Sequence, residues 1–276
     1  MTPHEERHII EPESGLARLD WREIYRSREL AWVFIKRGIA VRYRQMALGI
    51  LWSFLEPLGL LALTTLVFGL MIRVPTGPYP YPVFVFSGLI PWLCFSKATN
   101  GAANSLLENI GIVSKVYFPR VLLPLTAAVR ELLDSAMLFA VLLVLAWLYG
   151  YAPGARIIFA PVLLLYVTLP ALGLGMAIGS ISIKFRDFRP LLALLLQAGF
   201  YTTPIFYPPE LVPPRFRAVY ELNPMYWGVE LSRWITLGKP LVIDASFFLS
   251  IVLSLIVVAV AYLIFARYER IAVDAQ

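Results

Sequence analysis

Residues that could do covalent chemistry are scarce in this sequence of 276 residues. The two histidines, His4 and His8, lie in a polar N-terminal stretch, and the single cysteine, Cys94, lies inside an apolar run. One cysteine can form neither a disulfide within the chain nor a metal site built from thiolates. The sequence also lacks a Gly-x-x-x-x-Gly-Lys-Ser/Thr loop, the usual cradle for ATP phosphates. We therefore expect no catalytic residue and no metal site.

Ionisable side chains within apolar segments are stronger candidates for function. Glu56 lies four residues from Trp52 in an apolar stretch, so both side chains share one face of a helix. A carboxylate inside a membrane is costly unless it faces a wet cavity or a partner. Arg130, Glu131 and Asp134 form a second group, in which Arg130 and Asp134 are one helical turn apart and can neutralise each other. Glu56 is therefore the better candidate for a functional role.

The composition indicates an all-α integral membrane protein. Hydrophobic residues make up 59% of the chain and charged residues only 15%, with a mean hydropathy of +0.72. Apolar runs near the length of about 20 residues that crosses a bilayer predict six transmembrane helices. We place them at about 49–72, 83–107, 121–149, 157–183, 191–207 and 245–266.

The N-terminal region predicts an amphipathic helix in front of the first span. Residues 1–20 are polar and irregular, which is typical of a mobile tail. Between residues 21 and 48, apolar residues recur at three- and four-residue spacings among arginines and lysines, as in a helix lying in the headgroup plane. A solvated helix packed on its own domain is the alternative, but little soluble domain remains. We expect no cleavable signal peptide, because the first 48 residues contain no apolar run of signal length.

The distribution of positive charge predicts the orientation. The first 48 residues, the loops 102–120 and 182–190 and the tail 267–276 carry 16 Lys and Arg, against 6 on the opposite side. The positive-inside rule then places both termini in the cytoplasm, which agrees with an even number of spans in the cytoplasmic membrane. We assign the net charge of +6 to this topology signal and expect no nucleic-acid partner.

The segment 207–240 departs from the pattern of single spans. Its prolines separate short, aromatic, semi-apolar pieces, so it cannot form one spanning helix. Two short helices that dip into the external leaflet and return would fit, and we favour this re-entrant interpretation over an ordinary external loop. The prolines are Pro208, Pro209, Pro213, Pro214, Pro224 and Pro240.

Small residues and short loops predict contacts rather than chemistry. Ala171, Gly175 and Gly179 recur every four residues in the fourth span, which indicates close helix packing within the bundle or in a dimer. The loops 108–120 and 184–190 are short, of mixed charge and aromatic. They suit a soluble partner that moves a membrane domain, although they could equally be positive-inside anchors.

Several stretches together resemble a known family, the permease subunits of ABC exporters for polysaccharides and polyol phosphates. They occur in the family's order and spacing at 48–52 (LGILW), 56–58 (EPL), 115–120 (KVYFPR), 124–125 (PL), 185–187 (FRD), 203–207 (TPIFY) and 223–225 (NPM). The resemblance runs from about Arg42 to the C-terminus. It implies a membrane domain over 49–266, working as a homodimer on two copies of a separate ATPase subunit. Such proteins export lipid-linked O-antigen, capsule or teichoic acid chains.

The resemblance also implies where the partner acts. The family's coupling elements match the loop 108–120, helped by the N-terminal helix and the second loop, and its external gate helices match the segment 207–240. The chain itself would need no cofactor, since ATP and Mg would be bound by the partner subunit. The expected coupling residues are Glu108, Lys115, Tyr117, Phe118, Arg120, Arg186 and Asp187.

Aromatic residues are candidates for the translocation path. Flat rings suit the CH-rich faces of sugars and tolerate sliding, but aromatic side chains equally fill lipid-facing or interhelical space. A permease of the same superfamily for a small drug or lipid would not need them. A secondary transporter would need internal repeats and more ionisable residues within the membrane. The expected path residues are Trp52, Glu56, Trp92, Phe95, Tyr201 and Phe206.

Overall fold

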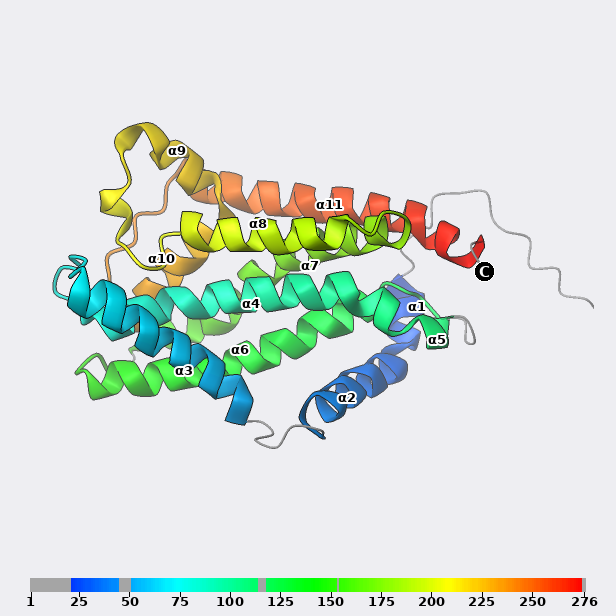
Figure 1. The fold of residues 1–276 in the computed structure, drawn as a ribbon, viewed down its shortest axis with the longest axis horizontal. Coiled ribbons are helices and arrows are strands. Elements are labelled where there is room, and N and C mark those ends of the chain that lie inside the picture. The colour runs from blue at the N-terminus through cyan, green and yellow to red at the C-terminus, as the bar shows by residue number, and fades with distance from the viewer. Residues whose placement is uncertain (1–20, 45–50, 114–117, 153, 275–276) are drawn as a thin grey trace, which may run out of the picture.

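The computed structural model describes residues 21–44, 51–113, 118–152 and 154–274 (Figure 1). Within these ranges the regular elements are all helical, and most run side by side along the long axis of the molecule. The long helices are α3 (Trp52–Thr64), which continues as the π-helix η2 (Thr65–Met71), α4 (Tyr81–Glu108), α6 (Leu122–Leu148), α7 (Ala160–Lys184), α8 (Phe188–Thr202) and α11 (Ala245–Asp274).

Five helices among the described residues are long and apolar enough to cross a membrane. They cover Trp52–Met71, Tyr81–Glu108, Leu122–Leu148, Ala155–Lys184 and Ala245–Tyr268, where the sequence predicts spans. The predicted run 191–207 falls on α8, which has 15 residues and ends at Thr202. It ends there because Pro204 disfavours helical geometry at Thr203, which is extended with ψ of 137°.

Helix α4 forms the centre of the bundle. Its first half is almost continuously buried from Val83 to Cys94, and it packs against α6 and α7. By contrast, only 17% of the residues in the most apolar stretch of Trp52–Met71, which combines α3 and η2, are buried in this single chain, and the same share is buried in α11. The outer helices therefore offer their apolar surfaces to lipid or to another chain, whereas the first half of α4 is enclosed.

The small residues of α7 explain how closely it approaches α4. A Cβ atom built on Gly175 would lie 2.5 Å from the carbonyl oxygen of Thr99, and one on Gly179 would lie 2.5 Å from that of Ala103. Only glycine permits such backbone contact. The packing face predicted for this helix is thus used within the bundle at both positions.

The N-terminal region forms two helices, α1 (Trp21–Arg26) and α2 (Arg28–Arg44), with a turn at Ser27 between them. Helix α2 packs against the start of α6, and its Phe34 is buried there. Other apolar side chains of α2, among them Trp32 and Val33, are exposed. Residues 45–48, the last of the predicted interfacial helix, lie outside the described residues.

Short helices close both ends of the bundle. Helix α5 (Ile110–Val113) lies at the same end as α1, α2 and the C-terminus (Figure 1). The opposite end carries η3 (Ala155–Phe159), η4 (Pro209–Leu211), α9 (Pro214–Leu222) and α10 (Pro224–Leu237).

The two helices of the proline-rich segment begin at prolines and differ in burial. Pro214 and Pro224 occupy the first positions of α9 and α10, where a missing N–H group costs nothing. The side chain of Asn223 caps α10 by accepting a hydrogen bond of 2.9 Å from the Met225 N–H. Helix α10 is largely buried against α4 and α7, whereas α9 is mostly exposed.

Candidate functional site

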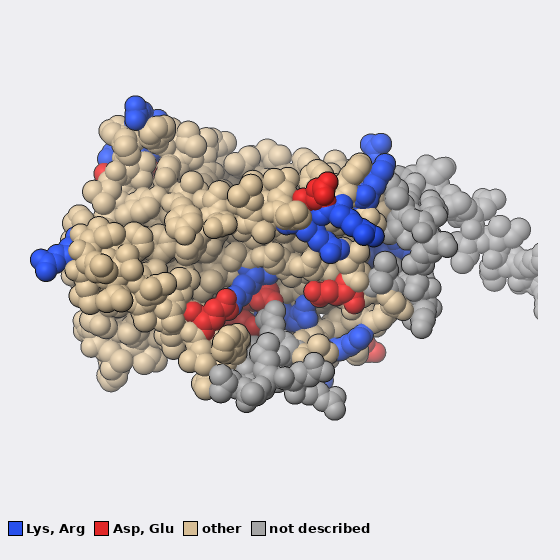
Figure 2. Space-filling view, viewed as in Figure 1, with Lys and Arg blue, Asp and Glu red and all other residues tan. Residues whose placement is uncertain are grey.

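A polar cleft opens between α3, α4 and α6. Its volume is about 380 Å³, and acidic and basic side chains gather around it on the face shown in Figure 2. The cleft is lined by Trp52, Ser53, Glu56, Lys97, Asn100, Gly101, Asn104, Glu108, Glu131 and Asp134.

Helix α4 contributes a continuous polar stripe to this cleft. Lys97, Asn100, Asn104 and Glu108 follow one another at spacings of three or four residues, so they lie along one face of the helix. At 1.5 Å per residue the stripe extends over roughly 16 Å. A span that is otherwise apolar therefore offers a hydrophilic lane over its second half.

Glu56 forms an ion pair with Lys97 inside the cleft. The Lys97 Nζ atom lies 2.9 Å from Oε2 of Glu56, and the two side chains remain 32% and 55% exposed. Trp52, one turn before Glu56, is also exposed at the cleft wall. The carboxylate thus has the partner that its position in a span requires.

The other four predicted path residues meet in an aromatic cluster between α4 and α8. The ring centroids of Trp92 and Phe95 are 5.5 Å apart, and Phe206 lies 4.9 Å from Phe200, which also contacts Trp92 and Tyr201. Gly199 allows Trp92 to pack directly on α8, because a Cβ atom at position 199 would lie 2.6 Å from the Trp92 ring.

Exposure differs strongly within the aromatic cluster. Trp92 and Phe206 are only 5% and 4% exposed, whereas Tyr201 is 60% exposed on the surface of α8. The predicted path residues therefore fall into two groups. Trp52 and Glu56 belong to the polar cleft, and Trp92, Phe95, Tyr201 and Phe206 belong to the aromatic cluster.

The predicted coupling residues are spread over the end of the bundle that carries α5. Glu108 is exposed at the end of α4, and Arg186 and Asp187 are exposed between α7 and α8. Phe118 is buried against Phe34 of α2, with ring centroids 5.4 Å apart. Arg120 follows in the turn before α6 and is half-buried, while Lys115 and Tyr117 lie outside the described residues.

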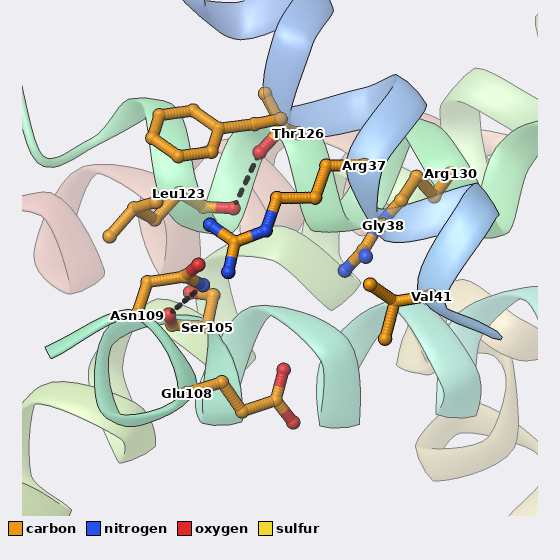
Figure 3. Close-up of a pocket in the computed structure, with 10 residues that line it drawn as sticks. Arg37, Gly38, Val41, Ser105, Glu108, Asn109, Leu123, Thr126 and Arg130 are labelled. Carbon is orange, nitrogen blue, oxygen red and sulfur yellow. Dashed lines mark hydrogen bonds between the residues drawn. The ribbon is translucent and has the colours of Figure 1, made fainter. Parts of the chain in front are cut away.

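A second, smaller pocket lies beneath α2. Its volume is about 150 Å³, and the guanidinium groups of Arg37 and Arg130 extend toward it from α2 and α6 (Figure 3). Arg130 passes directly against Gly38, where a Cβ atom would collide with the guanidinium group. Glu108 lines both this pocket and the polar cleft, so the two cavities meet at that residue.

The least expected residue is Arg233, which charge counting places in an external loop. It is 0% exposed, and its Nη1 atom donates a hydrogen bond of 2.9 Å to Glu230. Its Nη2 atom donates to the carbonyl oxygens of Pro204 and Ile205. The sequence holds one signal for this arrangement, the i,i+3 spacing of Glu230 and Arg233 within an aromatic stretch.

Lys239 extends this buried ion pair toward the surface. Its Nζ atom lies 2.8 Å from Glu230 and 3.3 Å from Glu210, whose side chain is 66% exposed. The pKa of the Glu210 carboxyl lies below its ordinary value. Partial burial raises this pKa, but a backbone hydrogen bond and the Lys239 ammonium together outweigh that effect.

Comparison with known proteins confirms the resemblance. Residues 29–237 match the ABC-2 type transporter family. The O-antigen export system permease protein RfbA of Myxococcus xanthus is 32% identical over 187 residues, which are 68% of this chain and 71% of that protein. The polysialic acid transport protein KpsM of Escherichia coli is 26% identical over 71% of this chain and 77% of that protein. The capsule polysaccharide export inner-membrane protein CtrC of Neisseria meningitidis serogroup B is 24% identical over 77% and 81%. The chain therefore belongs to the ABC-2 type transporter family.

Proposed function

We propose that this chain is the transmembrane permease subunit of an ATP-driven exporter that moves a lipid-linked polysaccharide across the cytoplasmic (inner) membrane. The substrate would be of the O-antigen, capsule or teichoic acid type. Three similar proteins, named for O-antigen export, polysialic acid transport and capsule polysaccharide export, support this substrate class. The family supports a separate ATPase subunit as the source of energy.

The observation that carries the proposal is the polar stripe of α4 beside the Glu56–Lys97 ion pair. Charged and amide side chains open to the outside of a single chain would be costly against lipid. A second copy of the chain, facing the first across α3 and α4, would close the cleft into a passage between two polar walls. A hydrated glycan needs such a passage, and we therefore propose a homodimer whose interface lines the path.

The path would combine two surfaces. The polar stripe would exchange hydrogen bonds with sugar hydroxyl groups, and Tyr201 would present the exposed edge of the aromatic cluster to sugar rings. The rest of the cluster would hold Tyr201 in place from the protein interior, since Trp92 and Phe206 are almost fully buried and Phe206 contacts Tyr201. Phe95 completes this inner layer through its contact with Trp92. Trp52 would contribute a further ring at the cleft wall.

We propose six crossings, with α8 and the bent segment 203–207 after it as the fifth. Both described ends of the chain lie at the end of the bundle that carries α5, which fits two cytoplasmic termini (Figure 1). Helices α9 and α10 would then form the external gate segment within 207–240. The burial of α10 against α4 and α7 supports a re-entrant position, since broken helices at membrane depth must be covered by protein.

Coupling would occur at the cytoplasmic end. Two copies of the ATPase subunit, which bind ATP and Mg, would contact the loop 108–120 together with Arg186 and Asp187. Glu108 links this loop to both cavities, and the contact of Phe118 with Phe34 links it to α2. Movement of the loop would therefore reach the cleft and the N-terminal helix together.

One experiment tests the homodimer and its interface. In a Cys94→Ser background, Asn100→Cys in the cleft should cross-link to the same residue of a second copy in native membranes. Leu255→Cys on the exposed face of α11 is the control and should not cross-link. Cross-linking at position 255 alone would contradict the proposed interface.

A second experiment tests the transported substrate. Disruption of the gene for this chain should abolish surface polysaccharide, and the wild-type chain should restore it. The chain purified from native membranes should carry an ATPase subunit. Surface polysaccharide that persists without the chain would contradict the function.

A further inference from the structure

We propose that Arg233 is a positioning residue for the break in helical structure after α8, at residues 203–205. By holding this break in place, Arg233 places Phe206 in the aromatic cluster. The residues concerned lie on three separate parts of the fold, namely α10, the segment 203–207 and α4. The consequence for export depends on the proposed function, but the positioning role itself does not.

The break after α8 leaves backbone carbonyl groups that a helix would have satisfied. Pro204 and Ile205 are both buried, so water cannot reach these groups easily. A buried carbonyl group without a donor is unfavourable, above all at membrane depth. The Nη2 atom of Arg233 donates to both oxygens, at 2.7 Å for Pro204 and 3.0 Å for Ile205.

The charge of Arg233 is balanced within the protein. Glu230 accepts a hydrogen bond of 2.9 Å from its Nη1 atom, and the guanidinium carbon lies 3.7 Å from the ring centre of Phe84. Such a contact attracts a cation to the aromatic face. Glu230 is in turn held by Lys239 at 2.8 Å. The guanidinium group is thus held by Glu230 and Phe84 in addition to its hydrogen bonds to the break.

The break is also pressed closely onto α4. A Cβ atom on Gly88 would lie 3.2 Å from the Cα atom of Ile205 and 3.4 Å from Nη2 of Arg233. Glycine at position 88 therefore leaves the space in which Arg233 and the break meet. Arg233 of α10 therefore lies between the break and α4 and contacts both.

Phe206 follows directly after the two carbonyl groups to which Arg233 donates. Its own carbonyl oxygen accepts a hydrogen bond of 3.2 Å from the Tyr81 hydroxyl. Its ring stacks on Phe68 at 5.2 Å and lies 4.9 Å from Phe200. The position of this ring is therefore set by the backbone that Arg233 holds, and any displacement of α10 would move Phe206 with it.

Chemical cross-linking tests this role without relying on transport. The reporter pair is Phe68→Cys with Phe206→Cys in a Cys94→Ser background, joined by a short linker that reacts with two thiols in the full-length chain. The control pair is the native Cys94 with Thr168→Cys. In the wild-type chain Sγ of Cys94 lies 3.5 Å from Oγ1 of Thr168, and both positions are far from Arg233 in the sequence. Arg233→Gln should lower reporter cross-linking at least tenfold and leave the control pair unchanged. Arg215→Gln, on the exposed helix α9, should change neither.

A charge reversal separates positioning from simple ion pairing. Glu230→Arg with Arg233→Glu keeps opposite charges at the two positions but presents a carboxylate to the Pro204 and Ile205 carbonyl oxygens. We expect no recovery of reporter cross-linking in this double variant. Recovery would overturn the proposal, as would normal reporter cross-linking in Arg233→Gln.

A conservative variant covers the case in which Arg233→Gln fails to fold and lowers both pairs. Arg233→Lys keeps the charge and a donor and should retain at least half of the reporter signal. A loss of reporter signal with an intact control pair in Arg233→Lys would overturn the positioning role. If reporter cross-linking depends on Arg233 but the wild-type chain exports no polysaccharide, the proposed function fails and the positioning role stands.

Discussion

Phe34 and Phe118 pack against each other with their ring centroids 5.4 Å apart, and this contact joins the N-terminal helix α2 to the start of α6. Both side chains are buried, at 8% and 6% exposure. The Phe118 side chain is therefore engaged within the chain. A partner that pushes on the loop 108–120 would act through this contact, and α2 would move with the loop.

Phe118→Ala should uncouple α2 from the bundle. Loss of a buried phenylalanine costs about 3–5 kcal/mol, and here the loss falls on one local contact. We expect faster proteolysis after Arg37 or Lys36 on α2, and a strong fall in surface polysaccharide at an unchanged membrane level. Phe185→Ala, on the other loop and 45% exposed, is the matched control and should leave α2 protected. Unaltered protection of α2 in Phe118→Ala would contradict the role of this contact.

Glu56→Gln should destabilise the chain and impair export, because the Lys97 ammonium would lose its carboxylate partner. An exposed ion pair in water contributes about 0–1 kcal/mol, and an isolated charge at a bilayer centre costs roughly 2.5–3.5 kcal/mol. The expected loss of unfolding free energy lies between these two limits. The reversed pair, Glu56→Lys with Lys97→Glu, should recover most of the loss. Thermal unfolding in lipid nanodiscs measures the first effect and surface polysaccharide the second. A reversed pair no better than either single variant would argue against the ion pair.

Gly175→Ala should destabilise the bundle, because the added Cβ atom would lie 2.5 Å from the Thr99 carbonyl oxygen. Overpacking of this kind costs about 1–3 kcal/mol. Gly59→Ala is the matched control, since no atom lies within 4 Å of a Cβ atom at that position of α3. It should be neutral or stabilising by up to about 1 kcal/mol, because alanine favours helix more than glycine does. Thermal unfolding of the two variants checks the contrast, and equal melting temperatures would contradict it.

Glu210→Gln should lower stability at neutral pH but not at low pH. The folded-state pKa of Glu210 is depressed, so its contribution is present above the unfolded-state pKa and disappears as the pH falls through the folded-state value. The side chain is 66% exposed, which limits the effect to about 1 kcal/mol or less. Melting temperatures of both proteins, measured from pH 7 downward, should begin to converge as the pH falls below the ordinary glutamate pKa of about 4.3 and should meet below the depressed folded-state pKa. A constant difference across this range would argue against the ion pair with Lys239.

Hydropathy predicted where the long helices lie, because a span is defined by the length and composition of one continuous segment. The runs 83–107 and 121–149 correspond to α4 and α6 within a few residues. The run 191–207 extends beyond α8, since Pro204 ends a helix that hydropathy alone would continue. Proline also accounts for the starts of α9 and α10, because it is favoured at the first position of a helix.

The sequence by itself determined that the chain is apolar and helical, and that Glu56 needs a partner or water. Only the tertiary structure decided that this partner is Lys97, 41 positions away, that Gly175 packs on Thr99, and that Arg233 is buried on the carbonyl groups of Pro204 and Ile205. The physical reason is that helix formation depends on neighbours in the sequence. The pairing of charges and small residues depends on which helices lie side by side, and that follows from the packing of the whole bundle.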